Sequence, residues 1–271
     1  MTEQFTVKSD ELEIAVEIFG NGPPLIFAHG LSGNRAFTKR QFQPLCEDFR
    51  IITFDQRGHG DSTPIKNPEL YDAARMANDI AAILDALNIT QAVVGGESMG
   101  SATALKFALQ WPQRVKSLLL TAPAFGDKPN TETERLQFLS KLIFERGIKF
   151  CLATMPERMR TEQGASAEVI QTISDMWRSH DPESLATALA TVATWVLFSD
   201  LDILKTLTMQ VRIIAWDNDP LHSLALAQKL NDIFPDSVLK TIPSMLTLFE
   251  RPQIVGETYR QMLNEAFSGS K

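Results

Sequence analysis

The stretch that decides the fold is Gly96-Glu97-Ser98-Met99-Gly100. It follows a short apolar run at residues 92–95, which is typical of a buried strand, and it precedes a helical pattern at residues 101–109. A serine between glycines at a strand-to-helix turn is the pattern of a nucleophile elbow, because small flanking residues let the chain turn sharply and leave the hydroxyl exposed above the sheet. We therefore expect Ser98 to be a nucleophile held in a strained backbone conformation.

Similar apolar runs recur along the chain. Further buried strands are expected at residues 24–28, 50–54, 115–121, 211–215 and 238–242, a hairpin at residues 5–8 and 12–19, and helices at residues 37–46, 71–87 and 253–266. Buried strands that alternate with helices indicate a mostly parallel sheet with right-handed crossovers. The sequence thus predicts an α/β fold with helices on both faces of the central sheet.

The alternation stops between residues 124 and 205, where only helical patterns occur. Asp181-Pro182 predicts a helix start, because aspartate caps a helix and proline fits its first position. We expect residues 1–123 and 206–271 to form the sheet domain and residues 124–205 to form a helical cap. The apolar side chains of this cap form either its own core or an apolar acyl pocket; they are Phe138, Leu142, Phe144, Met155, Met159, Met176 and Trp177.

Composition limits the classes of function. The chain has 271 residues, 44% of them hydrophobic, and a net charge of -7. An acidic chain repels phosphate, so we expect a small-molecule partner and neither nucleic acid nor a membrane. Cys46 and Cys151 form no spacing motif, and we expect no metal and no cofactor. With no leader or long apolar run, a cytoplasmic location follows by default, and the oligomeric state stays open.

Two further motifs follow predicted strands: His29-Gly30-Leu31, and the segment from Asp55 to Ser62 that reads D-Q-R-G-H-G-D-S. Together with residues 96–100, they resemble the α/β-hydrolase fold family in order and spacing, over about residues 5–123 and 206–267. The resemblance implies a serine esterase or lactonase. An oxyanion needs two backbone N–H groups aimed at one point, and we expect them from Leu31 and Met99. His29 and His59 are expected to be structural.

The family also carries an acid after a later strand. Asp219, which precedes Pro220 in the loop after residues 211–215, matches that position. Its role would be to fix the tautomer of a histidine and to stabilise the imidazolium. Asp217 in the same loop is a weaker candidate, and Asp127 is a third.

The family's histidine is absent from its expected position. It usually occurs as Gly-His after the last strand, five residues before the glutamate of an E-R-P segment. In this chain, counting back from Glu250 reaches Met245. The spacing indicates that Gly-His is missing between Met245 and Leu246, through natural shortening or deliberate deletion. Loss of this histidine costs roughly 10⁶ in kcat, so the sequence predicts a chain that binds ligands but hardly turns them over.

Two other histidines of the chain differ in their suitability as replacements. His180 lies beside the predicted helix start and is expected to be solvated. His222, three residues after Asp219, is also expected to be solvated, but it is the only candidate for a substitute base.

Two main functions compete. The first is an α/β-hydrolase for a small or medium apolar ester, lactone or related acyl substrate, impaired in this chain. The alternative is a non-catalytic small-molecule-binding protein on the same scaffold. A lyase or a cofactor-free oxygenase is a third interpretation, because a fold does not fix a reaction.

Overall fold

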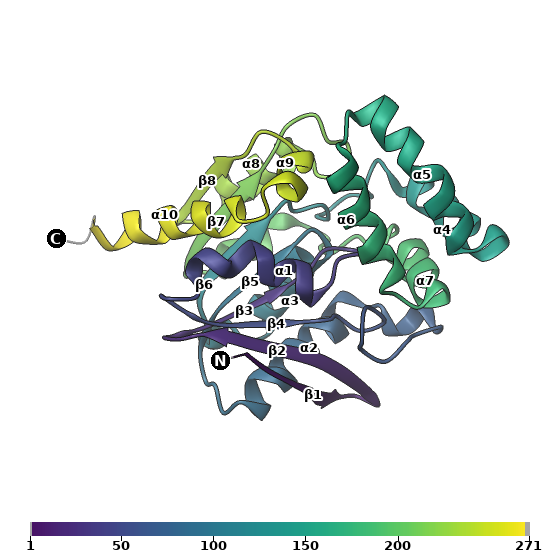
Figure 1. Ribbon diagram of the computed structural model, residues 1–271. Coiled ribbons are helices and arrows are strands. Elements are labelled where there is room, and N and C mark those ends of the chain that lie inside the picture. Colours follow the sequence, from purple (N-terminus) through teal and green to yellow (C-terminus); the bar gives the residue numbers. More distant parts are fainter. Residues whose placement is uncertain (1, 269–271) are drawn as a thin grey trace.

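An eight-stranded sheet forms the centre of the molecule (Figure 1). The structure is a computed structural model that describes residues 2–268. The strands are β1 (Glu3–Ser9), β2 (Leu12–Gly20), β3 (Pro24–Ala28), β4 (Arg50–Phe54), β5 (Ala92–Glu97), β6 (Val115–Thr121), β7 (Gln210–Ala215) and β8 (Ser237–Thr241). Their order is β1-β2-β4-β3-β5-β6-β7-β8. The pairs β1–β2 and β2–β4 are antiparallel and the others parallel, so the predicted fold class is confirmed.

Helices cover both faces of this sheet. The long ones outside the β6–β7 connection are α1 (Arg35–Phe42), α2 (Ala73–Ala86), α3 (Met99–Gln110), α8 (Leu224–Ile233) and α10 (Ile254–Ser268). One apolar core holds Ile80 of α2, Leu105 of α3 and Leu230 of α8, whereas Phe42 of α1 and Tyr259 of α10 belong to the core on the opposite face. Because both faces are buried, the central strands read as continuous apolar runs rather than alternating ones.

Four helices connect β6 to β7: α4 (Thr133–Arg146), α5 (Ile148–Gln163), α6 (Ala167–Arg178) and α7 (Pro182–Val192). They share an apolar cluster of their own, which includes Leu136 and Leu185. In Figure 1 they stand together beyond one edge of the sheet, in teal and green. The start of α7 is as predicted, with the Asp181 carboxylate accepting a hydrogen bond from the N–H of Ser184 at 2.8 Å. The domain boundaries at residues 123 and 206 stay a prediction.

The remaining elements are short. They are the 3₁₀ helices at Gln43–Leu45, Pro68–Leu70, Pro112–Arg114 and Leu201–Thr206, and the helix α9 (Met245–Glu250) after β8. Because the carboxyl ends of parallel strands meet at one edge, the segments after β3, β5 and β7 come together there. Within residues 2–268, no helix is long and apolar enough to cross a membrane.

Candidate active site

The turn between β5 and α3 places Ser98 at the carboxyl edge of the sheet. Its φ of 53° and ψ of -111° lie outside the ordinary regions for a side-chain-bearing residue, so the strained turn predicted from the sequence is confirmed. The flanking glycines are required: a Cβ on Gly96 would lie 2.0 Å from the carbonyl oxygen of Gly100, and one on Gly100 would lie 2.1 Å from that of Ala28. The turn leaves the Ser98 side chain at the wall of a cavity.

His222 lies between Ser98 and Asp219. Its Nε2 is 2.9 Å from Ser98 Oγ, and its Nδ1 is 2.7 Å from Asp219 Oδ2. Only 8% of His222 is exposed, so the expectation of a solvated residue is wrong. The reason is a local turn, in which Asp219 Oδ1 accepts a hydrogen bond from the N–H of Leu221 at 3.0 Å and folds the chain back toward Ser98. Helix α8 begins only after this turn.

Asp219 lies at the same sheet edge as Ser98, as predicted. Its Oδ2 also accepts a hydrogen bond from Trp216 Nε1 at 2.8 Å. Burial alone would raise the pKa of Asp219, but the hydrogen bond and charge of His222 and the donors of Trp216 and Leu221 outweigh it, so the pKa lies well below its ordinary value. Asp219 is therefore a carboxylate at neutral pH. Among the described residues, neither Asp217 nor Asp127 is hydrogen-bonded to a histidine.

The segment after β8 contains no histidine, as the sequence states. Met245 is the first residue of α9, whose N-cap Ser244 accepts a hydrogen bond from the N–H of Thr247 at 3.3 Å. The Met245 side chain lines the same cavity as Ser98. His222 already contacts both Ser98 and Asp219. The structure therefore does not support the inference that the site is incomplete. The space predicted to lack an imidazole is occupied by His222.

The residues expected to form an oxyanion hole lie beside Ser98. Met99 opens α3, and the first N–H of a helix has no carbonyl one turn earlier to bond. Leu31 lines the cavity, and its N–H has no hydrogen-bond acceptor among the described residues. Ser32, with a φ of 63°, turns the loop after β3 around this point.

Three buried histidines support that loop, and we call His29, His59 and His180 the histidine cluster. The rings of His29 and His180 lie 5.1 and 5.2 Å from the ring of His59. His29 Nδ1 is 2.7 Å from the oxygen of Gly30. Burial lowers the pKa of all three, that of His29 to about 4, so they are neutral at pH 7. These contacts agree with the structural roles expected for His29 and His59.

The expectation of a solvated His180 is wrong, because only 5% of it is exposed. The turn between α6 and α7 packs against the sheet domain at this residue. His180 Nδ1 accepts a hydrogen bond from the N–H of Gly60 at 3.0 Å, and its Nε2 lies 2.9 Å from the oxygen of Ser32. His180 therefore ties the helices of the β6–β7 connection to the loop beside Ser98.

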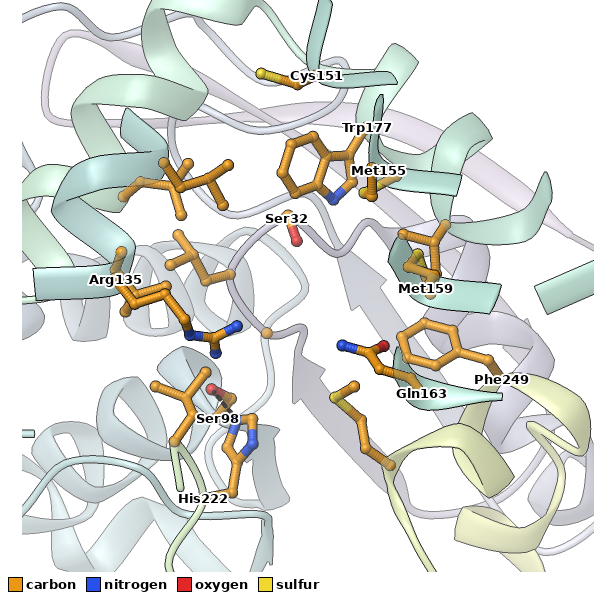
Figure 2. Close-up of a pocket in the computed structure, with 18 of the residues that line it drawn as sticks. Ser32, Ser98, Arg135, Cys151, Met155, Met159, Gln163, Trp177, His222 and Phe249 are labelled. Carbon is orange, nitrogen blue, oxygen red and sulfur yellow. Dashed lines mark hydrogen bonds between the residues drawn. The ribbon is translucent and has the colours of Figure 1, made fainter. Parts of the chain in front are cut away.

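A cavity of about 420 Å³ extends from Ser98 into these helices. Figure 2 shows Ser98 and His222 at one end and Trp177, Met155 and Cys151 at the other. Of the seven apolar cap residues named from the sequence, Phe138, Leu142, Met155, Met159 and Trp177 line the cavity. Phe144 is instead exposed, and Met176 packs into the core on the α1–α10 side of the sheet. In the described part of the chain, no three His, Cys, Asp or Glu side chains are arranged to hold a metal ion.

Comparisons with known proteins agree with this architecture. The chain is 26% identical to 3-oxoadipate enol-lactonase 2 of Acinetobacter baylyi over 92% of each chain. It is 28% identical to 2-(acetamidomethylene)succinate hydrolase of Mesorhizobium japonicum over 83% of this chain and 81% of that protein. Among solved structures, a thermophilic esterase from Thermogutta terrifontis superimposes with a TM-score of 0.80 at 26% identity, covering 97% of this chain and 98% of that one.

The sequence profile of the α/β-hydrolase fold matches residues 23–243, which is most of the chain. The protein therefore belongs to the α/β-hydrolase fold family and is a hydrolase of that superfamily.

Proposed function

We propose that the protein is a serine hydrolase that cleaves small or medium apolar esters or lactones, with Ser98 as nucleophile, His222 as general base and Asp219 as its supporting acid. The observation that carries this proposal is the position of His222, with one ring nitrogen on Ser98 and the other on Asp219. On this proposal the triad is complete, and the impairment inferred from the segment after β8 does not apply.

The geometry supports the following reaction. Ser98 Oγ attacks the carbonyl carbon while its proton passes to His222 Nε2, and the carboxylate of Asp219 stabilises the resulting imidazolium through Nδ1. The negative charge on the carbonyl oxygen is stabilised by the N–H groups of Leu31 and Met99. His222 then gives its proton to the leaving alcohol. In the second half of the reaction, water gives a proton to His222 and attacks the acyl carbon, and His222 returns the proton to Ser98 Oγ as the acid is released.

The cavity and the relatives support this substrate class. The cavity has a volume of about 420 Å³, which is that of a pocket for a small molecule, and most of its lining is apolar. The relatives that cover most of the chain include an enol-lactonase and an esterase. Esters and lactones share a carbonyl carbon bonded to an oxygen, and an activated serine attacks that carbon.

The experiment is to measure hydrolysis of p-nitrophenyl butyrate and of γ-decalactone by the purified chain and by Ser98→Ala. We expect kcat/KM of at least about 10⁴ M⁻¹s⁻¹ for one of them in the unaltered chain and a loss of roughly 10⁶ in the variant. Tight binding of these compounds without turnover would contradict the proposal and favour a binding protein.

A further inference from the structure

Glu97 is a second acidic side chain beside Ser98, and the proposed reaction does not use it. It is the last residue of β5 and one of the residues that line the cavity. Its Oε2 accepts a hydrogen bond from Nε2 of Gln41, a residue of α1 that is 1% exposed, at 2.8 Å. Among the described residues no cation pairs with Glu97, whereas the cavity residues Arg135 and Arg158 are each paired with a glutamate.

The other carboxyl oxygen of Glu97 lies near Gly30, in the loop after β3 that also carries Leu31. A Cβ built on Gly30 would lie 3.2 Å from Glu97 Oε1 and 3.4 Å from Ser98 Cβ, so both groups flank the same point next to the loop of Leu31. No hydrogen-bond partner for Oε1 occurs among the described residues. Since the residue is only partly exposed and lines the cavity, this oxygen is open to a ligand there.

A purely structural link to Gln41 does not require a carboxyl group, because a neutral amide would accept the same hydrogen bond. Placing a carboxyl group in a mostly apolar pocket without a cation costs free energy, and such groups are concentrated at functional sites. Burial raises the pKa of Glu97, against the opposing effects of Gln41 and His222. A hydroxyl group suits either protonation state, since it donates to a carboxylate and accepts from a carboxylic acid.

We propose that Glu97 is a specificity-determining residue, whose Oε1 binds a hydroxyl group on the carbon next to the scissile carbonyl, so that the preferred substrates are α-hydroxy esters and lactones with an apolar tail. The proposal rests on Ser98 being the nucleophile: Glu97 Oε1 and Ser98 Cβ lie 3.2 and 3.4 Å from one point beside Gly30, which favours a hydroxyl close to the carbonyl that Ser98 attacks. The apolar tail would lie in the cavity between α4, α5 and α6.

The test compares γ-decalactones that carry either a hydroxyl or a methyl group at the α-carbon, which are similar in size. The readout is kcat/KM for the hydroxy lactone divided by kcat/KM for the methyl lactone, measured on the same enzyme. A change in the folded fraction or in the reactivity of the triad affects both values equally and cancels in this ratio. We expect this ratio to fall about tenfold in Glu97→Leu, because the substrate hydroxyl is then buried without a partner, and to be largely kept in Glu97→Gln, whose amide can still bond it. Glu97→Met replaces the leucine variant if that does not fold.

The matched control is Gln41→Leu, which removes the same Glu97–Gln41 hydrogen bond but leaves the carboxyl group. Its ratio should stay near that of the unaltered chain. If Glu97→Leu and Gln41→Leu lower both rates alike with no change in ratio, Glu97 has only a structural role and the proposal is overturned.

A binding measurement separates this proposal from the proposed function. Ser98→Ala is titrated calorimetrically with both lactones, with and without Glu97→Leu. We expect tighter binding of the hydroxy lactone by Ser98→Ala and loss of that preference in the double variant. If the unaltered chain cleaves neither p-nitrophenyl butyrate nor any of these lactones, the proposed function fails, while the titration still decides on Glu97. Equal affinities for the two lactones would overturn the role of Glu97.

Discussion

Replacing His222 by alanine removes the group that links Ser98 to Asp219. The structure gives His222 one contact of 2.9 Å to the nucleophile and one of 2.7 Å to the acid, and the described residues place no other histidine against Ser98. The proton of Ser98 then has no acceptor, so we expect kcat to fall by roughly 10⁶, equivalent to about 8 kcal/mol of transition-state stabilisation. The oxyanion hole and substrate binding should leave about 10³–10⁴ over the uncatalysed reaction.

The effect on stability should be much smaller. Asp219 loses one hydrogen bond in His222→Ala but keeps those from Trp216 and Leu221, so we expect a loss of about 1–3 kcal/mol in the free energy of unfolding. The assay is steady-state hydrolysis of p-nitrophenyl butyrate, with urea unfolding to confirm the fold. His180→Ala is the matched control, because it also removes a buried histidine but one that does not contact Ser98. The reasoning is refuted if the kcat of His222→Ala stays within about tenfold of that of the unaltered chain, because loss of a triad member should have a far larger effect.

Three further predictions concern the fold and the segment after β8. Burial holds the pKa of His29 at about 4, whereas a histidine of the unfolded chain titrates near 6.5, so the unfolded chain binds the extra proton. His29 alone should lower the free energy of unfolding by about 3 kcal/mol as pH drops from about 6.5 to 4, in addition to the losses from His59 and His180. Urea midpoints that stay constant over this range would contradict it. Gly100→Ala should lower the free energy of unfolding by at least about 3 kcal/mol, because its Cβ meets backbone atoms. Gly164→Ala, which has open space around it, should lower it by only about 1–2 kcal/mol because of its positive φ. Equal losses of the two variants in thermal unfolding would argue against a tight elbow. Insertion of Gly-His between Met245 and Leu246 should not raise esterase activity, because His222 already contacts Ser98 and the insertion interrupts α9; a gain of several orders of magnitude would restore the interpretation of a missing base.

The sheet could be predicted because its signals are local. Both faces are covered, so β3 and β4 appear in the sequence as short apolar runs, and the structure gives both strands the predicted bounds, residues 24–28 and 50–54. The elbow was predictable for a similar reason, since only glycine fits at Gly96 and Gly100.

The environment of the histidines could not be predicted in this way, because it depends on contacts between distant segments. His222 is near Asp219 in sequence, but its position over Ser98 depends on the turn at Asp219 and on the meeting of β5 and β7 at one sheet edge. His180 contacts Gly60, which is 120 residues away. The one local signal for His222 was an aspartate-proline pair followed two residues later by histidine, because aspartate side chains often accept hydrogen bonds from N–H groups two residues on.

The most direct test of the central claim, that Ser98 is activated by His222, is the rate and site of labelling by a fluorophosphonate. The reagent reacts with a serine whose proton is removed by a positioned base, and mass spectrometry of the digested protein locates the adduct. We predict fast labelling of one residue, Ser98, in the unaltered chain, and labelling slower by orders of magnitude in His222→Ala. Slow labelling of the unaltered chain, an adduct elsewhere, or equal rates in the two proteins would contradict the claim.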